Sequence, residues 1–244
     1  MAKTNKILLA AGVAAAAGVA TYLSGRKPRT HMVWYSDFEL EVGGETGRIR
    51  DLAAAYVPEF YVEPALDAHP RCGGLRPDAV RYEAVPAGNL LVLNYFLDWQ
   101  DEIHPSARFK PLHRIFRKVY YASARDIEFV QIGVSRDTGE VVRIAFERDP
   151  SNDPFVGYPI HQLVVARRDS AADDFKVEID GEPFDAPPFE FNGRRAKMMT
   201  ATWNHEYDFY KSDAMPVGEI PLYWLTDDIY QKFAFYRRSK PPIL

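Results

Sequence analysis

Hydrophobic and polar residues alternate along much of the chain after residue 30, with the two-residue period typical of β-strands. The clearest case is residues 89–100, in which one face carries only large apolar side chains: Leu91, Leu93, Tyr95, Leu97 and Trp99. Shorter segments of the same kind predict an extended segment over residues 31–42 and further strands over residues 80–85, 126–134, 140–146, 160–167, 175–179 and 196–204. Turn residues such as Arg136 to Gly139 join neighbouring strands as hairpins.

Apolar residues recur with helical spacing in only three segments, residues 48–56, 110–121 and 222–236. Because strands do not alternate with helices, a doubly wound parallel sheet is disfavoured. No glycine-rich phosphate loop follows a strand, so nucleotide binding has no support. The sequence therefore predicts a mainly β (α+β) fold, an antiparallel β-sandwich with a few helical insertions, formed by a single domain over residues 31–244.

Residues 1–30 form a separate unit, because an uncharged apolar run from Ile7 to Leu23 lies between basic residues on both sides. This pattern is typical of a signal peptide or an N-terminal membrane anchor, and the run is at the short end for a transmembrane helix. We expect an uncleaved signal-anchor in slight preference to a cleaved signal peptide, with an Ala-rich soluble helix as a third alternative. The membrane is then a partner through this helix, and the location is the cell envelope, membrane-anchored or secreted.

The formal net charge of −4 conceals two regions of opposite sign. Residues 1–29 hold five of the 30 Lys and Arg residues and no Asp or Glu, so the rest of the chain sets 25 basic against 34 acidic residues, a net charge of −9. No basic stripe interleaved with aromatic residues appears in the acidic part, which disfavours nucleic acid as a partner. Cys72 is the only cysteine, which excludes an intrachain disulfide and a paired-cysteine zinc site.

Carboxylates interrupt two of the predicted strands. Asp98 stands at the end of the 89–100 segment, and Asp126 and Glu128 share one face of the next long strand. Two carboxylates at positions i and i+2 of a strand lie roughly 7 Å apart and repel each other unless a cation is near. That cation is either a metal ion or an arginine, so each carboxylate is a candidate metal ligand with a structural ion pair as the alternative.

Two histidines add to these candidates. His205 follows Met199, Ala201 and Trp203 on one face of the predicted 196–204 strand, and His161 begins the 160–167 strand. With the carboxylates they give a candidate metal set of Asp98, Asp126, Glu128, His161 and His205. Oxygen ligands with one imidazole favour Ca²⁺ or Mg²⁺ over Zn²⁺. Glu128 and His205 are also the candidate catalytic residues, as general base toward a polar substrate.

The strand that carries Asp126 and Glu128 resembles part of the H-x-x-D-W-E pattern of necrosis-inducing, NPP1-like proteins and of Vps62-like proteins. Asp126 and Glu128 match its D-x-E part, whereas Ile127 and Ser123 stand where the pattern has Trp and His. The resemblance spans roughly residues 90–146. It implies a β-sandwich, a divalent cation bound by the motif's Asp and Glu in the necrosis-inducing branch, and membrane or glycan association.

Two functions remain open at this point. The first is an exported or membrane-anchored envelope domain whose carboxylate and histidine site depends on a divalent cation and acts on a polar substrate. The second is a non-enzymatic envelope module that binds protein, glycan or a membrane surface, with its acidic residues paired to arginines. Convergence of Asp98, Glu128, His161 and His205 in space would favour the first.

Overall fold

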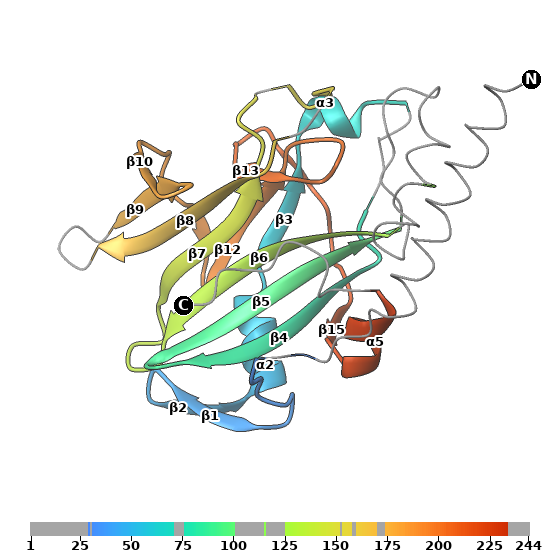
Figure 1. The fold of residues 1–244 in the computed structure, drawn as a ribbon. Helices are drawn as coiled ribbons and strands as arrows, with labels where there is room; N and C mark the ends of the chain where they lie inside the picture. The colour runs from blue at the N-terminus through green and yellow to red at the C-terminus, as the bar shows by residue number, and fades with distance from the viewer. Residues whose placement is uncertain are drawn as a thin grey trace, which may run out of the picture.

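A computed structural model of the protein describes residues 29, 31–70, 76–100, 115, 125–151, 153–157, 160–169 and 174–233. The fold is dominated by two β-sheets with short helices at their edges (Figure 1). The predicted mainly β fold class is therefore confirmed.

The larger sheet has eight strands in the order β10-β9-β8-β7-β6-β5-β4-β15. Successive strands from β4 to β10 pair antiparallel, and β15 joins the edge parallel to β4. Short turns join β4 to β5, β6 to β7 and β9 to β10, whereas residues 100–125 stand between β5 and β6. The bounds of these strands are β4 Ala79–Ala87, β5 Leu90–Trp99, β6 Asp126–Ser135, β7 Val141–Arg148, β8 Gln162–Asp169, β9 Asp174–Ile179, β10 Glu182–Phe184 and β15 Leu222–Trp224.

The smaller sheet has five strands, with β11-β12-β3-β14 as its main order and β13 paired to β12. Its strands are β3 Glu59–Val62, β11 Phe191–Asn192, β12 Arg195–Thr200, β13 Tyr207–Phe209 and β14 Met215–Pro216. A separate hairpin is formed by β1 Glu39–Val42 and β2 Glu45–Arg48. The helices are α2 Ile49–Tyr56, α3 Pro64–Asp67 and α5 Asp227–Lys232.

The main core lies between the two sheets. Leu93, Tyr95 and Leu97, on the face of β5 that the sequence predicted, are buried in one cluster with Met198 and Tyr207 of the smaller sheet. Helix α2 closes one end of this core. Its buried residues recur with helical spacing and form one apolar stripe that packs into the core: Ile49, Leu52, Ala53 and Tyr56. Face-to-face packing of two mostly antiparallel sheets is the arrangement of a β-sandwich.

Two predicted helices have different outcomes. The segment 110–121 lies almost entirely outside the described residues. In the segment 222–236, the prediction of one continuous helix is wrong, because residues 222–224 form strand β15 and the helix begins only after Thr226. The Thr226 hydroxyl accepts the backbone N–H of Ile229, which caps the helix at this point.

The predicted N-terminal anchor, residues 1–30, lies outside the described residues apart from Arg29. Among the described residues, no helix combines the length and the apolar character that crossing a bilayer requires.

Candidate functional site

Asp126 and Glu128 lie side by side on the inner face of the larger sheet, where β6 begins. The register places Asp126 opposite Trp99 and Glu128 opposite Leu97, so both carboxylates share the face of β5 that packs into the main core. Both residues are buried. The predicted alternation is therefore present, and its consequence is two neighbouring carboxylates with little contact with water.

His205 reaches this pair from the turn between β12 and β13. The strand expected over residues 196–204 ends at Thr200, and His205 occupies the left-handed region with φ of 68°. Its Nδ1 lies 2.9 Å from Asp126 Oδ2, and its ring stacks on Trp99 with centroids 3.9 Å apart. Because a carboxylate only accepts, Nδ1 carries the shared proton, and Nε2 has no hydrogen-bond partner among the described residues.

A second histidine meets two further carboxylates beside this pair. His161 Nδ1 lies 3.2 Å from Glu147 Oε2 and 2.9 Å from Glu206 Oε1. The contact with Glu147 has hydrogen-bond geometry, whereas neither oxygen of Glu206 is in hydrogen-bond geometry with any described donor. The Glu206 side chain is 0% exposed. A fully buried carboxylate in this state is costly unless a proton or a cation neutralises it.

These side chains interact strongly enough to shift one another's titration. Burial raises the pKa of Glu128 well above its ordinary value, and the charges of Asp126, Glu147 and Glu206 raise it further, against the opposing charge of His161. The hydrogen bond to Glu147 and the contact with Glu206 raise the pKa of His161 to about 11. His161 is therefore an imidazolium at neutral pH, and Glu128 keeps its proton to a higher pH than an ordinary glutamate.

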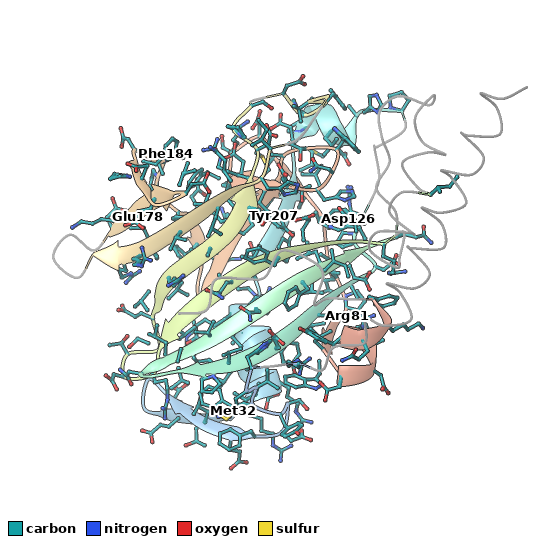
Figure 2. The ribbon with its side chains drawn as sticks, viewed as in Figure 1. Met32, Arg81, Asp126, Glu178, Phe184 and Tyr207 are labelled. Carbon is teal, nitrogen blue, oxygen red and sulfur yellow. The ribbon has the colours of Figure 1, made fainter. Side chains whose placement is uncertain are left out.

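Tyr207 lies near Asp126 and Glu128, and sequence reasoning did not identify it. Its phenol is buried, its hydroxyl has no hydrogen-bond partner among the described residues, and burial together with the charges of Glu128 and Asp126 raises its pKa well above the ordinary value. Figure 2 shows Tyr207 and Asp126 in the region where β6, β7 and β13 meet. The only signal in the sequence is its place two residues after His205.

Asp98 is not brought to this cluster. It is paired with Ile127 in the sheet register, so its side chain projects from the opposite face to that of Asp126 and Glu128. Arg81 Nε lies 3.1 Å from Asp98 Oδ2, and Arg125 Nε contacts Asp98 Oδ1. Two guanidinium groups thus neutralise this buried carboxylate, which is the structural ion pair considered as its alternative role.

We call the set Asp126, Glu128, Glu147, His161, His205 and Glu206 the acid–imidazole cluster. As the side chains stand, no three His, Cys, Asp or Glu residues of the described part of the chain are arranged to chelate a metal ion. The donor set nevertheless suits a hard divalent cation, because it is mostly carboxylate oxygen and includes the fully buried Glu206. A pocket of about 510 Å³ lies elsewhere, at β3 and β14, and contains no member of the cluster.

Comparison with known proteins gives only a distant likeness. No known family and no curated protein matches the chain. Solved structures that resemble it include NLPPya in complex with glucosamine, with 13% identity, a TM-score of 0.37, and coverage of 80% of this chain and 78% of that one. A second, described as a toxin fold for microbial attack and plant defense, has 13% identity, a TM-score of 0.39, and coverage of 84% and 87%.

These neighbours are of the necrosis-inducing, NPP1-like kind that the strand with Asp126 and Glu128 resembles. The likeness is too low to bear on activity or ligand. The described residues by themselves define the class as a β-sandwich with a buried acid–imidazole cluster at one end.

Proposed function

We propose that the acid–imidazole cluster binds a divalent cation, Ca²⁺ or Mg²⁺ in preference to Zn²⁺, and that the domain uses this site on a polar substrate at the cell envelope. The observation that carries the proposal is Glu206, whose carboxylate is fully buried and lies 2.9 Å from a His161 ring that also serves Glu147. One shared imidazolium balances these desolvated carboxylates only in part, and a bound cation would remove the remaining cost.

Charge balance points the same way. Asp126, Glu128, Glu147 and Glu206 bring four carboxyl groups together, and His161 supplies one positive charge among them. A proton on Glu128, whose pKa is raised, reduces the excess only in part. A site with surplus negative charge and little water is one that a divalent cation neutralises efficiently.

Glu128, Glu147 and Glu206 are the residues that would hold the cation, because Glu147 and Glu206 contact the same imidazolium and Glu128 is close enough to feel its charge. His161 is 49% exposed, so its ring is free to leave the cluster when a metal ion replaces its charge. When bound, the cation would polarise an oxygen of the substrate or lower the pKa of a water molecule. Asp98 is left out of this set, because Arg81 and Arg125 already neutralise it.

The chain's own base is the pair of Asp126 and His205. The carboxylate fixes the imidazole as the tautomer protonated on Nδ1, which leaves the Nε2 lone pair to accept a proton. Trp99 holds the ring in one orientation by stacking on it. A left-handed backbone at a residue other than Gly costs of order 1 kcal/mol and is found where the surrounding structure and the function hold it.

The alternative is a non-enzymatic envelope module that binds protein or glycan. The observation that favours it is the contact of His161 with Glu147 and Glu206, since the chain itself neutralises part of the cluster in this way. The envelope location rests in both cases on the apolar run from Ile7 to Leu23 with its basic flanks.

Calorimetric titration of the full-length chain in detergent with Ca²⁺, Mg²⁺, Mn²⁺ and Zn²⁺ tests the proposal. We expect Ca²⁺ or Mg²⁺ to bind and to raise the unfolding temperature, and Glu206→Gln to weaken binding at least about tenfold. Glu178→Gln, an exposed carboxylate on β9 outside the cluster, is the matched control and leaves binding unchanged. Absence of binding, or binding unchanged by Glu206→Gln and by Asp126→Ala/Glu128→Ala, would overturn the cation site and leave the interaction module.

A further inference from the structure

Arg29, which follows the apolar run from Ile7 to Leu23, is fixed to the larger sheet. Arg29 is almost fully buried, and its Nε lies 3.3 Å from Glu83 Oε2 on β4. The same guanidinium donates to the backbone carbonyl of Leu225 at 2.8 Å and lies over the ring of Tyr230 at 5.0 Å. These contacts come from β4 and from the α5 region, so Arg29 belongs to the folded domain.

Glu83 is built into the sheet to receive this residue. It is buried, and its Oε1 lies 2.9 Å from Asn94 Nδ2 and 2.9 Å from His31 Nε2. Asn94 in turn accepts from Gln131 on β6. Arg29 and His31 are thus both held by a buried polar network of the larger sheet.

Chain reach sets how far the domain can be from the anchor. Arg29 stands six positions after Leu23, the end of the apolar run, and an extended chain covers at most ~3.6 Å per residue, which gives about 22 Å. If the apolar run spans the membrane, the edge of the domain formed by β4 and α5 lies within that distance of the bilayer surface.

The next residues expose large apolar side chains at this place. Met32 is 70% exposed, Tyr35 is 74% exposed and Phe38 is also exposed. Trp34 stacks on Phe38 with centroids 5.9 Å apart and is fixed to β4 by a hydrogen bond from its backbone to Ala84. Aromatic side chains with a polar atom are favoured at the membrane–water interface, where one part is apolar and the other is hydrated.

We propose that Met32, Tyr35 and Phe38, which we call the aromatic collar, lie in the headgroup region of the bilayer that holds the chain's own N-terminal anchor. This inference rests on the membrane-anchored part of the proposed function, and it adds a fixed orientation. The acid–imidazole cluster then faces away from that bilayer. Trp34 pairs with Ala84, which stands opposite Leu93, and Trp99 lies six residues farther along β5, or roughly 20 Å.

The separation is visible in Figure 2, where Met32 lies by β1 and β2 and Asp126 lies at the far end of β6. A substrate for the cluster would accordingly come from the aqueous side of the envelope and not from the lipid that holds the anchor. The exposed carboxylates beside the collar, Asp37 and Glu39, are paired with the exposed Arg50 and Arg48. These pairs leave no surplus of one charge beside the collar, so a zwitterionic surface is the expected lipid partner and anionic lipid adds nothing to it.

Depth-dependent fluorescence quenching tests this orientation. The full chain carries Cys72→Ser, so that one introduced thiol takes the label, and is reconstituted in phosphatidylcholine vesicles. A label at Tyr35→Cys is compared with one at Glu178→Cys, an exposed position on β9. We expect lipid-borne quenchers to reduce the signal at position 35 at least twofold more than at position 178. Adding phosphatidylglycerol should not increase this difference.

Equal quenching at the two positions in vesicle-bound protein would overturn the orientation and leave the anchor in place. Protein that does not stay with the vesicles would overturn the anchor and the orientation together, and cation titration of the same sample reports on the acid–imidazole cluster separately. Glu83→Gln provides a second test, because it weakens the attachment of Arg29. We expect this variant to lower the quenching at position 35 toward that at position 178, and unchanged quenching would show that the collar does not depend on this attachment.

Discussion

The imidazole of His205 lies flat against the indole of Trp99, with ring centroids 3.9 Å apart and the ring planes within 2° of each other. The two residues are far apart in the chain, and Trp99 closes strand β5 directly opposite Asp126. The stacking therefore places the His205 Nδ1 at the carboxylate that it contacts. Without the indole, the ring would rest on a turn whose backbone is itself unfavourable at His205.

Replacement of Trp99 tests how much of the site depends on this contact. Trp99→Ala removes a buried ring and should lower the free energy of unfolding by about 3–5 kcal/mol. Trp99→Phe keeps an aromatic face for the imidazole and should cost clearly less. Urea unfolding monitored by far-UV circular dichroism measures both. Equal losses in the two variants would show that a phenyl ring does not replace the indole beneath His205.

The larger sheet could be predicted from the sequence because its strands follow one another along the chain. Alternation fixes which side of β5 and β6 is buried, and the short turns between β4 and β5 and between β6 and β7 favour antiparallel pairing there. The smaller sheet could not be predicted in the same way. Strand β3 pairs in parallel with β12, more than 130 residues later, and such a pairing leaves no local pattern.

The site was predictable in its residue types but not in its groupings. Asp126 and Glu128 share a face because of the strand period. Asp98 pairs with Ile127, the residue between them, so its side chain lies on the other face of the sheet. A shift of one residue moves a side chain to the other face of a sheet, and sequence alone does not give the pairing of β5 with β6. Glu147 and Glu206 enter the cluster only through tertiary contacts with His161.

Asp98 provides a prediction that separates stability from cation binding. Asp98→Asn leaves the Arg81 and Arg125 guanidinium groups without their shared carboxylate, and breaking a buried ion pair from one side costs about 3–5 kcal/mol. We expect a lower urea midpoint with no change in affinity for Ca²⁺ or Mg²⁺ at a temperature where the variant is folded. A loss of cation affinity in the folded variant would place Asp98 in the site after all.

The pH dependence of stability follows from His161 and Glu128. The pKa of His161 is raised to about 11 by Glu147 and Glu206, so the folded protein holds a proton that the unfolded chain releases near pH 6.5. This stabilisation is complete below pH 6.5 and is lost as the pH rises toward 11. The pKa of Glu128 is also raised, so its carboxyl keeps a proton in the folded protein that the unfolded chain loses. Glu128 therefore also makes stability fall with rising pH, beginning at a lower pH than His161 does.

We therefore expect stability without added cation to fall steadily as the pH rises from 6.5 to 10, as measured by urea unfolding at fixed ionic strength. Since the His161 ring is half-exposed, solvent reduces the slope well below the one-proton limit of about 1.4 kcal/mol per pH unit. His161→Gln should flatten the curve over this range, and His31, the partly buried partner of Glu83, offers the comparison variant His31→Gln. An unchanged slope in His161→Gln would exclude His161 as its source.

One hydroxyl makes two hydrogen bonds within the turn that carries His205 and Glu206, in addition to backbone hydrogen bonds across that turn. Thr202 Oγ1 donates to Asn204 Oδ1 at 2.7 Å and accepts the backbone N–H of Glu206 at 3.1 Å, and all three residues are buried. Thr202→Val keeps the volume but leaves both partners without their hydrogen bond, which should cost about 2 kcal/mol or more.

Thr200→Val is the matched control for this change. Thr200 is two residues earlier and equally buried, but its hydroxyl has no hydrogen-bond partner among the described residues. Replacing it by a methyl group removes an unsatisfied polar atom, so its free energy of unfolding should stay the same or rise. Urea unfolding of the two variants side by side checks the contrast, and similar losses in both would mean that the Thr202 hydroxyl does not order the turn. Because the turn positions Glu206, we also expect Thr202→Val, but not Thr200→Val, to weaken divalent cation binding.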